Sequence, residues 1–210
     1  MITSVNAIKN GKQNENAYLV TDENKNTLII DPGSDPHLII ESIEKKGLNP
    51  IAIIATHAHW DHISATSEIT EHYNIPFALH PFDSKLLKSL NLYRWMIDKI
   101  PFGKIPTINI QLENEVELVL ENFKITPYLI GSHTKGSVLL QIENHLFSGD
   151  IIFKGAIDEE TKANKQLELI KIIEKISNLA EDITVYPGHG TKTQLKSELQ
   201  NIKDLKLRKS

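Results

Sequence analysis

Residues 54–63 read IATHAHWDHI, in which three histidines and one aspartate fall within six consecutive positions. Imidazole nitrogens and carboxylate oxygens bind zinc, iron and manganese, and a ligand set without sulfur does not choose among these metals. The four side chains, His57, His59, Asp61 and His62, directly follow an apolar run that is typical of a buried strand. So dense a cluster rarely arises by chance, and the pattern predicts a metal site rather than an ordinary polar loop.

Three further polar side chains follow apolar segments in the same way. His133 lies in LIGSHTKGS, Asp150 in LFSGD and His189 in VYPGHG. Because loops at one edge of a sheet lie side by side, we expect these three loops to converge on the histidine-rich one. The neighbouring glycines allow the backbone to approach a ligand closely. Histidines on one ion, and a carboxylate shared with a second ion about 4 Å away, form a hydrolytic site with two metals.

A scaffold of strands that end near one another must position these side chains. Short apolar segments bounded by turn residues predict strands, with tight hairpins at 121–122 and 143–144. Apolar residues three to four positions apart predict helices. The expected strands are 16–20, 27–30, 51–55, 115–120, 123–130, 136–142, 145–147 and 183–186, and the expected helices are 36–46, 64–73, 83–90, 165–179 and 192–205. This alternation with hairpins favours a mixed α/β sandwich, in one domain over residues 1–210.

The composition argues against several classes of function. The chain has 210 residues, a net charge of −4 and no cysteine. Without cysteine there are no disulfides, thiolate ligands or thiol nucleophile, and the charge argues against binding of nucleic acid. No apolar run approaches the roughly 20 residues that span a bilayer, and residues 1–12 lack the pattern of a signal peptide. We therefore expect a cytoplasmic protein that acts on a small molecule and binds neither nucleic acid nor a membrane.

Together the motifs resemble those of the metallo-β-lactamase-fold hydrolases. The resemblance rests on Thr-His-x-His-x-Asp-His at 56–62, a variant of Gly-x-His-Thr-x-Gly-Ser at 131–137, Phe-x-Gly-Asp at 147–150, Pro-Gly-His-Gly at 187–190 and an early Asp-Pro-Gly turn at 31–33. It implies an αββα sandwich, in which helices flank two mixed β-sheets and the site lies at one edge.

The resemblance also implies which side chains hold metal. His57, His59 and His133 are expected to hold one divalent ion. Asp61, His62 and His189 are expected to hold a second, and Asp150 to bridge the two. Zinc is the first expectation for both ions, with iron or manganese as alternatives. By contrast, His37, His72, His80 and His145 fall outside the motifs, and we expect none of them to be a ligand.

Within this superfamily, the stretch SGDIIFKG resembles the short glyoxalase II-like thioesterases of the hydroxyacylglutathione hydrolase type. That resemblance implies hydrolysis of S-acylglutathione or a related thioester by a metal-bridging hydroxide, with Asp61 as the catalytic residue that orients the hydroxide. A thiol of pKa about 8.5 leaves as an anion without a strong general acid. One departure is the acidic stretch 158–160, where relatives carry a basic residue. It predicts weak binding of an anionic substrate unless Lys154, Lys162 or Lys165 compensates.

Two other hypotheses fit the same motifs. A mononuclear-iron persulfide dioxygenase would use His57, His133 and Asp150 and would consume oxygen. A lactonase or a phosphodiesterase would keep the hydrolytic site and change the substrate. The aromatic-rich segment 91–107 predicts either a lid or wall of the substrate pocket, or an amphipathic helix that covers the sandwich.

Overall fold

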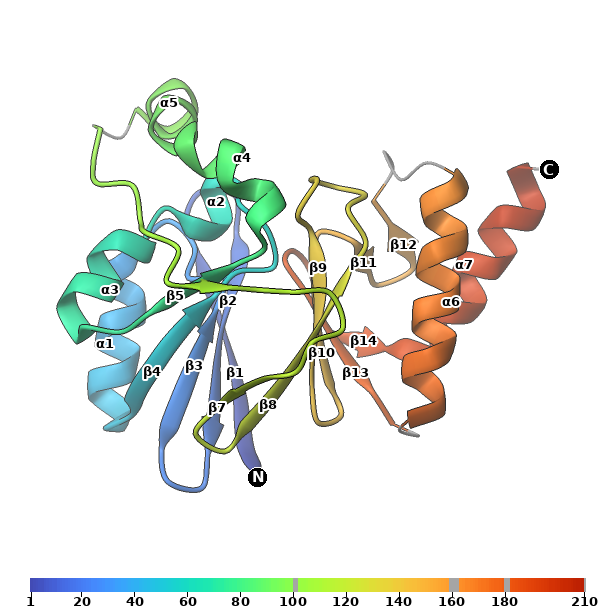
Figure 1. The fold of residues 1–210 in the computed structure, drawn as a ribbon, viewed down its shortest axis with the longest axis horizontal. Coiled ribbons are helices and arrows are strands. Elements are labelled where there is room, and N and C mark those ends of the chain that lie inside the picture. Colours follow the sequence, from blue (N-terminus) through green and yellow to red (C-terminus); the bar gives the residue numbers. More distant parts are fainter. Residues whose placement is uncertain (100–101, 159–162, 180–181, 210) are drawn as a thin grey trace.

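The computed structural model describes residues 1–99, 102–158, 163–179 and 182–209. Two six-stranded sheets pack against each other, and helices cover their outer faces (Figure 1). Both sheets contain parallel and antiparallel pairs. The predicted αββα sandwich of two mixed sheets is therefore confirmed. Across the described ranges, no helix is both long and apolar enough to cross a bilayer.

The first sheet has the strand order β1-β2-β3-β4-β5-β6. These strands are β1 (Ile2–Asn10), β2 (Glu15–Asp22), β3 (Asn26–Ile30), β4 (Asn49–Ile54), β5 (Phe77–Leu79) and β6 (Ile110–Gln111). The first three pair antiparallel, whereas β3 to β6 run parallel. Parallel strands end at the same edge of a sheet, so the loops that follow β3 and β4 lie next to each other.

Helices α1 (Pro36–Lys46) and α3 (Thr66–Tyr73) cover the outer face of this sheet (Figure 1). Helix α1 coincides with the predicted 36–46 because both of its ends are encoded locally. The Asp35 carboxylate accepts hydrogen bonds from the first turn, and Gly47 ends the helix in the left-handed conformation at φ 58°. Its apolar side, with Ile39 and Ile43, packs on the sheet.

The second sheet has the strand order β14-β13-β10-β9-β8-β7. These strands are β7 (Leu118–Leu120), β8 (Phe123–Leu129), β9 (Val138–Ile142), β10 (His145–Gly149), β13 (Thr184–Pro187) and β14 (Thr193–Gln194). Both predicted hairpins are confirmed, with left-handed residues at Glu121 and Glu143. Only the β10–β13 pair is parallel among the described strands of this sheet, and it brings the loops after these two strands together.

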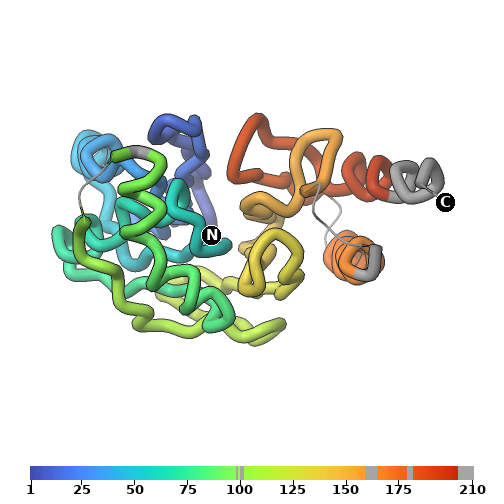
Figure 2. The backbone as a smooth tube through the Cα atoms, turned by 90° about the horizontal axis from the view of Figure 1, so that it is seen from above, coloured from blue at the N-terminus to red at the C-terminus, as the bar shows by residue number. Residues whose placement is uncertain are grey.

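Helices α6 (Ala163–Leu179) and α7 (Leu195–Lys209) cover the outer face of the second sheet, and a small hairpin of β11 (Ile152–Phe153) and β12 (Ala156–Ile157) lies beside them. Seen from above, Figure 2 shows the blue-to-green first half of the chain beside the yellow-to-red second half. The fold thus consists of two layered halves, each with its own sheet and its own helices.

The core between the sheets is built by alternation along each strand. In β2, all eight residues are buried. Tyr18 and Val20 face the second sheet, whereas Ala17 and Leu19 face the helices of the first half. The Tyr18 ring meets Phe147 of the second sheet edge to face at 5.3 Å. Period-2 packing on both faces explains why these central strands read as continuous apolar runs.

Several short elements were not predicted. They are β1, β5, β6, β11, β12, β14, the 3-10 turn η1 (Pro81–Asp83) and the single turn α2 (Trp60–Ile63). The helix predicted at 83–90 is divided into α4 (Ser84–Lys88) and α5 (Leu90–Tyr93), which continues into the π-helical turn η2 (Arg94–Asp98). Except for the nine-residue β1, these elements are segments of two to five residues, which carry too little periodicity to be recognised in a sequence.

Candidate metal centre

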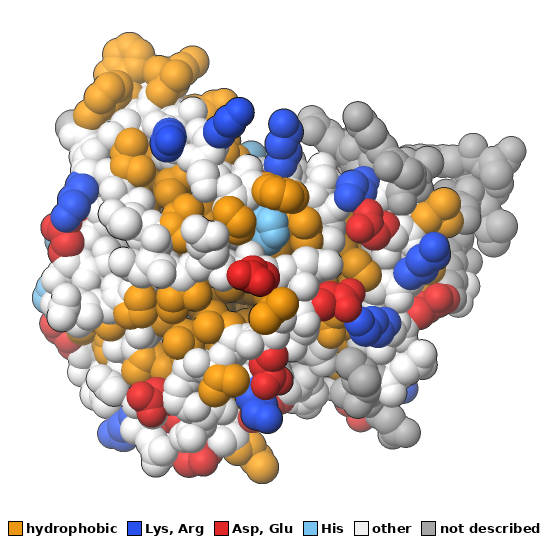
Figure 3. Space-filling view, viewed as in Figure 1, with side chains coloured by type: hydrophobic (Ala, Val, Ile, Leu, Met, Phe, Trp, Pro, Cys, Tyr) orange, Lys and Arg blue, Asp and Glu red, His pale blue; other side chains and the backbone are white. Residues whose placement is uncertain are grey.

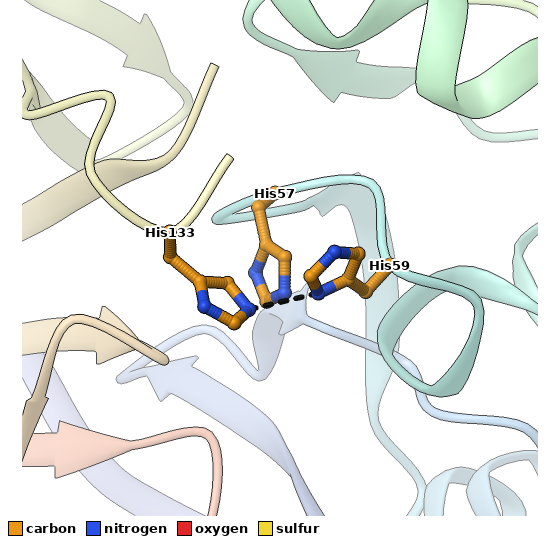
Figure 4. Close-up of side chains that lie close together, drawn as sticks. All are labelled: His57, His59 and His133. Carbon is orange, nitrogen blue, oxygen red and sulfur yellow. Dashed lines mark hydrogen bonds between the residues drawn. The ribbon is translucent and has the colours of Figure 1, made fainter. Parts of the chain in front are cut away.

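The loops that follow β4 and β8 bring three imidazoles together. One ligand atom each from His57, His59 and His133 lies within 4.8 Å of the others. Figure 4 shows the three rings pointing toward one another, with His133 Nε2 at 2.8 Å from His59 Nδ1. The His57 ring lies edge-on to both partners, at centroid distances of 4.7 and 4.8 Å. This arrangement is a three-histidine cluster of the kind that holds one divalent ion.

A second cluster combines Asp61 and His62 of α2 with His189, which follows β13. Asp61 Oδ2 lies 3.3 Å from His189 Nε2 and 3.8 Å from His62 Nε2. The segments that follow β4 and β13 thus bring side chains to one place, although they are far apart in the sequence. One carboxylate and two imidazoles form a second set that fits a divalent ion.

Asp150 lies between the two clusters. Its Oδ2 atom is 3.5 Å from His62 Nε2, 3.6 Å from His189 Nε2 and 3.6 Å from His133 Nε2. It therefore touches one nitrogen of the first cluster and two of the second. All seven residues predicted as ligands, His57, His59, Asp61, His62, His133, Asp150 and His189, are brought together by the fold.

The early Asp-Pro-Gly turn positions Thr56, which directly precedes His57, and His62. Asp31 accepts hydrogen bonds from the Thr56 amide and the Thr56 hydroxyl, both at 2.7 Å, and lies 3.1 Å from His62 Nδ1. Asp31 forms a further cluster with His57 and His62. Its oxygens contact Thr56 and the Nδ1 atom of His62, an arrangement typical of a carboxylate that orients a histidine ring. The other His62 nitrogen, Nε2, consequently faces Asp150.

Asp83 is a positioning residue that the sequence did not reveal. Its buried carboxylate accepts hydrogen bonds from the Ala58 amide at 2.9 Å, the Thr134 hydroxyl at 2.7 Å and the Gly136 amide at 2.7 Å. It therefore fixes the loop of His57 and His59 to the loop of His133. In the sequence, an aspartate directly before a helix is typical of an N-cap, but Asp83 caps no helix with its side chain. No local signal distinguishes the two roles.

Asn16 holds the loop of His189 to the first sheet. Its side-chain amide donates to Pro187 O at 2.8 Å and to Gly190 O at 3.1 Å, and its backbone amide donates to Gly188 O at 2.7 Å. The Tyr18 hydroxyl adds a hydrogen bond to Pro187 O at 2.6 Å. Gly188 is needed here because a Cβ at this position would lie 2.2 Å from Asp150 Oδ1.

The electrostatics of the site favour forms that bind cations. Burial, and then the neighbouring imidazoles, lower the pKa of His57, and burial followed by His133 lowers the pKa of His59 to about 4. Burial raises the pKa of Asp150, but the contact with His62 and the neighbouring His189 and His133 together outweigh burial and hold the pKa below the usual range. Neutral imidazoles and ionised carboxylates are the forms that bind metal.

The pKa values of His62 and His189 shift in the opposite direction, because carboxylates surround these two rings. Burial lowers the pKa of His62, but Asp150 and Asp31 outweigh burial and raise it well above the ordinary value. The hydrogen bond to Asp61 likewise raises the pKa of His189. Carboxylates from three separate segments, Asp31, Asp61 and Asp150, therefore draw positive charge to this cluster, which a divalent ion supplies as well as a proton does.

Three buried atoms show that a metal fits the residues present. His57 Nε2, His62 Nε2 and Asp150 Oδ1 have no hydrogen-bond partner among the residues that the structure describes. Buried polar atoms nearly always have a partner, and these three belong to the converging side chains. Metal ions that accept nitrogen and oxygen ligands match this donor set.

The four histidines outside the motifs lie away from the two clusters. His37 and His72 lie near Glu68 and Glu44 on the helices of the first half. His80 accepts a hydrogen bond from the Phe82 amide, and His145 contacts Tyr186. None of these four belongs to a metal-type cluster among the described residues.

The acidic stretch 158–160 turns one side chain toward the site. Asp158 Oδ2 lies 3.5 Å from His133 Nδ1, and the Asp158 side chain is only 12% exposed. Glu159, Glu160 and Lys162 lie outside the described residues. Asp158 therefore faces a histidine of the first cluster. That the stretch weakens the binding of an anionic substrate stays a prediction.

Two hollows open beside the clusters and share His59 and Leu86. The larger, of about 520 Å³, is bordered by His133 and by Lys85 and Lys135. The smaller, of about 190 Å³, is bordered by Trp60, Asp61 and residues of the segment predicted as a lid or wall. Of the three aromatic residues in that segment, Tyr93 borders this hollow, whereas Trp95 and Phe102 are exposed and border neither.

Known proteins share this fold and much of this sequence. A model of the metallo-β-lactamase superfamily matches residues 10–189. The chain is 34% identical to the probable metallo-hydrolase YqgX of Bacillus subtilis, over 87% of this chain and 88% of that protein. It is 29% identical to the hydroxyacylglutathione hydrolase GloC of Haemophilus influenzae, over 88% of this chain and 89% of that protein.

Solved structures agree with this assignment. The BLEG-1 B3 metallo-β-lactamase superimposes with a TM-score of 0.82 at 30% identity, over 94% of this chain and 97% of that one. TTHA1623 in a di-iron-bound form superimposes with a TM-score of 0.76 at 28% identity, over 93% of this chain and 98% of that one.

Proposed function

Because this chain belongs to the metallo-β-lactamase superfamily of metal-dependent hydrolases, we propose that it is a glyoxalase II-like thioesterase that cleaves S-acylglutathione or a related thioester. The observation that carries the proposal is the position of Asp150 Oδ2, which lies 3.5 to 3.6 Å from nitrogens of both clusters. The similarity to a hydroxyacylglutathione hydrolase along most of both chains supports the choice of a thioester.

In this proposal, His57, His59 and His133 hold one divalent ion, and Asp61, His62 and His189 hold the second, with Asp150 between them. Zinc suits these ligands, and so does iron, which a related structure binds as a pair. When bound, such a pair of ions supplies a water of lowered pKa and polarises a carbonyl oxygen.

The side chains of the site then orient the reactants. Asp61 offers a carboxylate that accepts a hydrogen bond from the attacking water and aims it at the carbonyl carbon. The water oxygen forms a bond to the carbonyl carbon, and its proton passes by way of Asp61 to solvent. The bond between carbon and sulfur then breaks, and the thiol leaves as an anion without a general acid, because its pKa is about 8.5. Lys85 and Lys135 border the larger hollow, where their charge favours an anionic thiol such as glutathione.

Hydrolysis of S-lactoylglutathione tests the proposal. The metal-replete protein is compared with protein stripped by a chelator and with stripped protein to which zinc or iron is returned. We expect turnover that disappears on stripping and returns with metal. If bound metal produces no cleavage of any thioester, the thioesterase proposal is wrong. Oxygen uptake with a persulfide would then favour the dioxygenase, and cleavage of lactones or phosphodiesters the other hydrolases.

Replacing Asp158 by asparagine is expected to weaken metal binding about 10-fold to 100-fold, because carboxylates that orient ligating histidines have effects of this size. The carboxylate contacts His133 Nδ1, so its loss frees the ring to turn away from the first ion. Competition with a chromophoric chelator measures the affinity without any need for activity. Asp158→Glu is the matched variant and should recover part of the affinity. Equal affinity in Asp158→Asn and the wild type would show that the contact does not position His133.

A further inference from the structure

The smaller hollow is apolar apart from the ligands at its inner end. Its lining residues are Ala58, His59, Trp60, Asp61, Leu86, Leu90, Tyr93 and Ile97. Helix α4 supplies Leu86, α5 supplies Leu90 and Tyr93, and η2 supplies Ile97. No lysine or arginine belongs to this lining, and Asp61 is its only acid among the described residues. The hollow therefore offers an apolar wall that leads to residues of both clusters.

The mouth of this hollow faces solvent. Leu90 is buried, but Tyr93 is 40% exposed and Ile97 is 48% exposed. Leu92, Trp95 and Met96 are exposed beside them, and Figure 3 shows hydrophobic side chains gathered at the top of the molecule, where α5 lies in Figure 1. Solvent-facing apolar side chains beside a reactive site are typical of a place where an apolar group binds.

The two hollows differ in chemistry but meet at His59. The larger one presents Lys85 and Lys135, whereas the smaller one presents aliphatic and aromatic side chains. A thioester has two arms that diverge from its carbonyl carbon. A carbonyl held at the clusters can therefore direct an anionic thiol arm into the lysine-bordered hollow and an apolar acyl arm into the smaller one.

We propose that the smaller hollow is the acyl subsite, and that thioesters of unbranched apolar acyl groups are cleaved faster than thioesters of short polar ones such as lactoyl. This proposal rests on the thioesterase function proposed above. The smaller hollow has a volume of about 190 Å³, which equals that of roughly six water molecules in the liquid. This is room for an acyl chain of about six carbons.

Chain length provides the first test. We expect kcat/KM to increase from S-acetylglutathione through S-butyrylglutathione to S-hexanoylglutathione by at least about tenfold in total. Each fully buried methylene contributes about 0.8 kcal/mol, which is roughly fourfold. Acyl chains that are too long for the hollow should give little further increase in kcat/KM. If S-acetylglutathione and S-hexanoylglutathione are cleaved equally well, the acyl subsite is wrong while the thioesterase function stands. If metal-loaded protein cleaves neither these substrates nor any other thioester, both proposals are wrong.

A blocking variant provides the second test. Ile97→Trp should fill the mouth and remove most of the preference for hexanoyl over acetyl. Met96→Trp is the matched control, since Met96 is equally exposed on the same turn but does not line the hollow. Tyr93→Ser, which makes the mouth polar, should also reduce the hexanoyl preference. An unchanged preference in both Ile97→Trp and Tyr93→Ser would overturn the assignment.

Discussion

Asp150→Asn is expected to lower turnover by at least about 100-fold and to reduce the amount of bound metal, because loss of a ligand should exceed the effect of losing an orienting neighbour. The carboxylate is the group that meets nitrogens from both clusters. Asparagine keeps the size of the side chain but not its charge, so the cluster around His62 also loses a partner that attracts cations. Metal analysis after dialysis, together with steady-state kinetics, measures both effects.

His37→Ala is the control for this prediction. His37 is an exposed histidine on α1, and its Nε2 lies 3.9 Å from Glu68. Its loss should change neither the metal content nor the turnover. Full activity in Asp150→Asn would exclude Asp150 as the bridging residue, and a large loss in His37→Ala would mean that a ligand has been assigned wrongly.

The second large effect is expected on stability. Asp31→Ala should lower the free energy of unfolding of the metal-free protein by about 3 to 5 kcal/mol, which is typical when one partner of a buried charged network is removed. The Thr56 amide, the Thr56 hydroxyl and His62 Nδ1 would all lose their acceptor. Urea denaturation in the presence of a chelator measures the loss without any contribution from bound metal.

Asp35→Ala is the matched comparison, since Asp35 lies four residues later in the same turn region. Its carboxylate only caps α1, by accepting from His37 N and Leu38 N. Removing an N-cap of this kind costs about 1 kcal/mol. Similar losses in the two variants would show that Asp31 has no special role in holding Thr56 and His62.

The sequence predicted the cluster residues well because each lies beside a local signal. His57, His59, Asp61 and His62 are close neighbours, and His133, Asp150 and His189 each follow an apolar strand with glycine nearby. Strand ends gather at a common edge, so the topology alone brings such residues together. The fold brings all seven together, while their roles as ligands stay a proposal.

The residues that position the clusters were harder to predict. Asp83 and Asp158 act through contacts with loops that are about 25 to 50 positions away in the sequence. A carboxylate that accepts from three donors looks, in a sequence, like any aspartate before a helix or on the surface. The lining of the smaller hollow, which includes Leu90 and Ile97, could not be predicted either. It depends on helical turns of four and five residues, which are stabilised by tertiary packing rather than by their own sequence.

The attachment of Asn16 to the loop of His189 has a consequence for folding. The first half contributes His57, His59, Asp61 and His62, and the second contributes His133, Asp150 and His189, so the clusters form only when the two halves dock. Asn16 and Tyr18 hold the two halves together without metal, because their side chains donate hydrogen bonds to backbone carbonyls of residues 187–190. An ion that binds only the docked state stabilises it by mass action. Such an ion would slow the separation of the halves, with little effect on the earlier formation of each sheet.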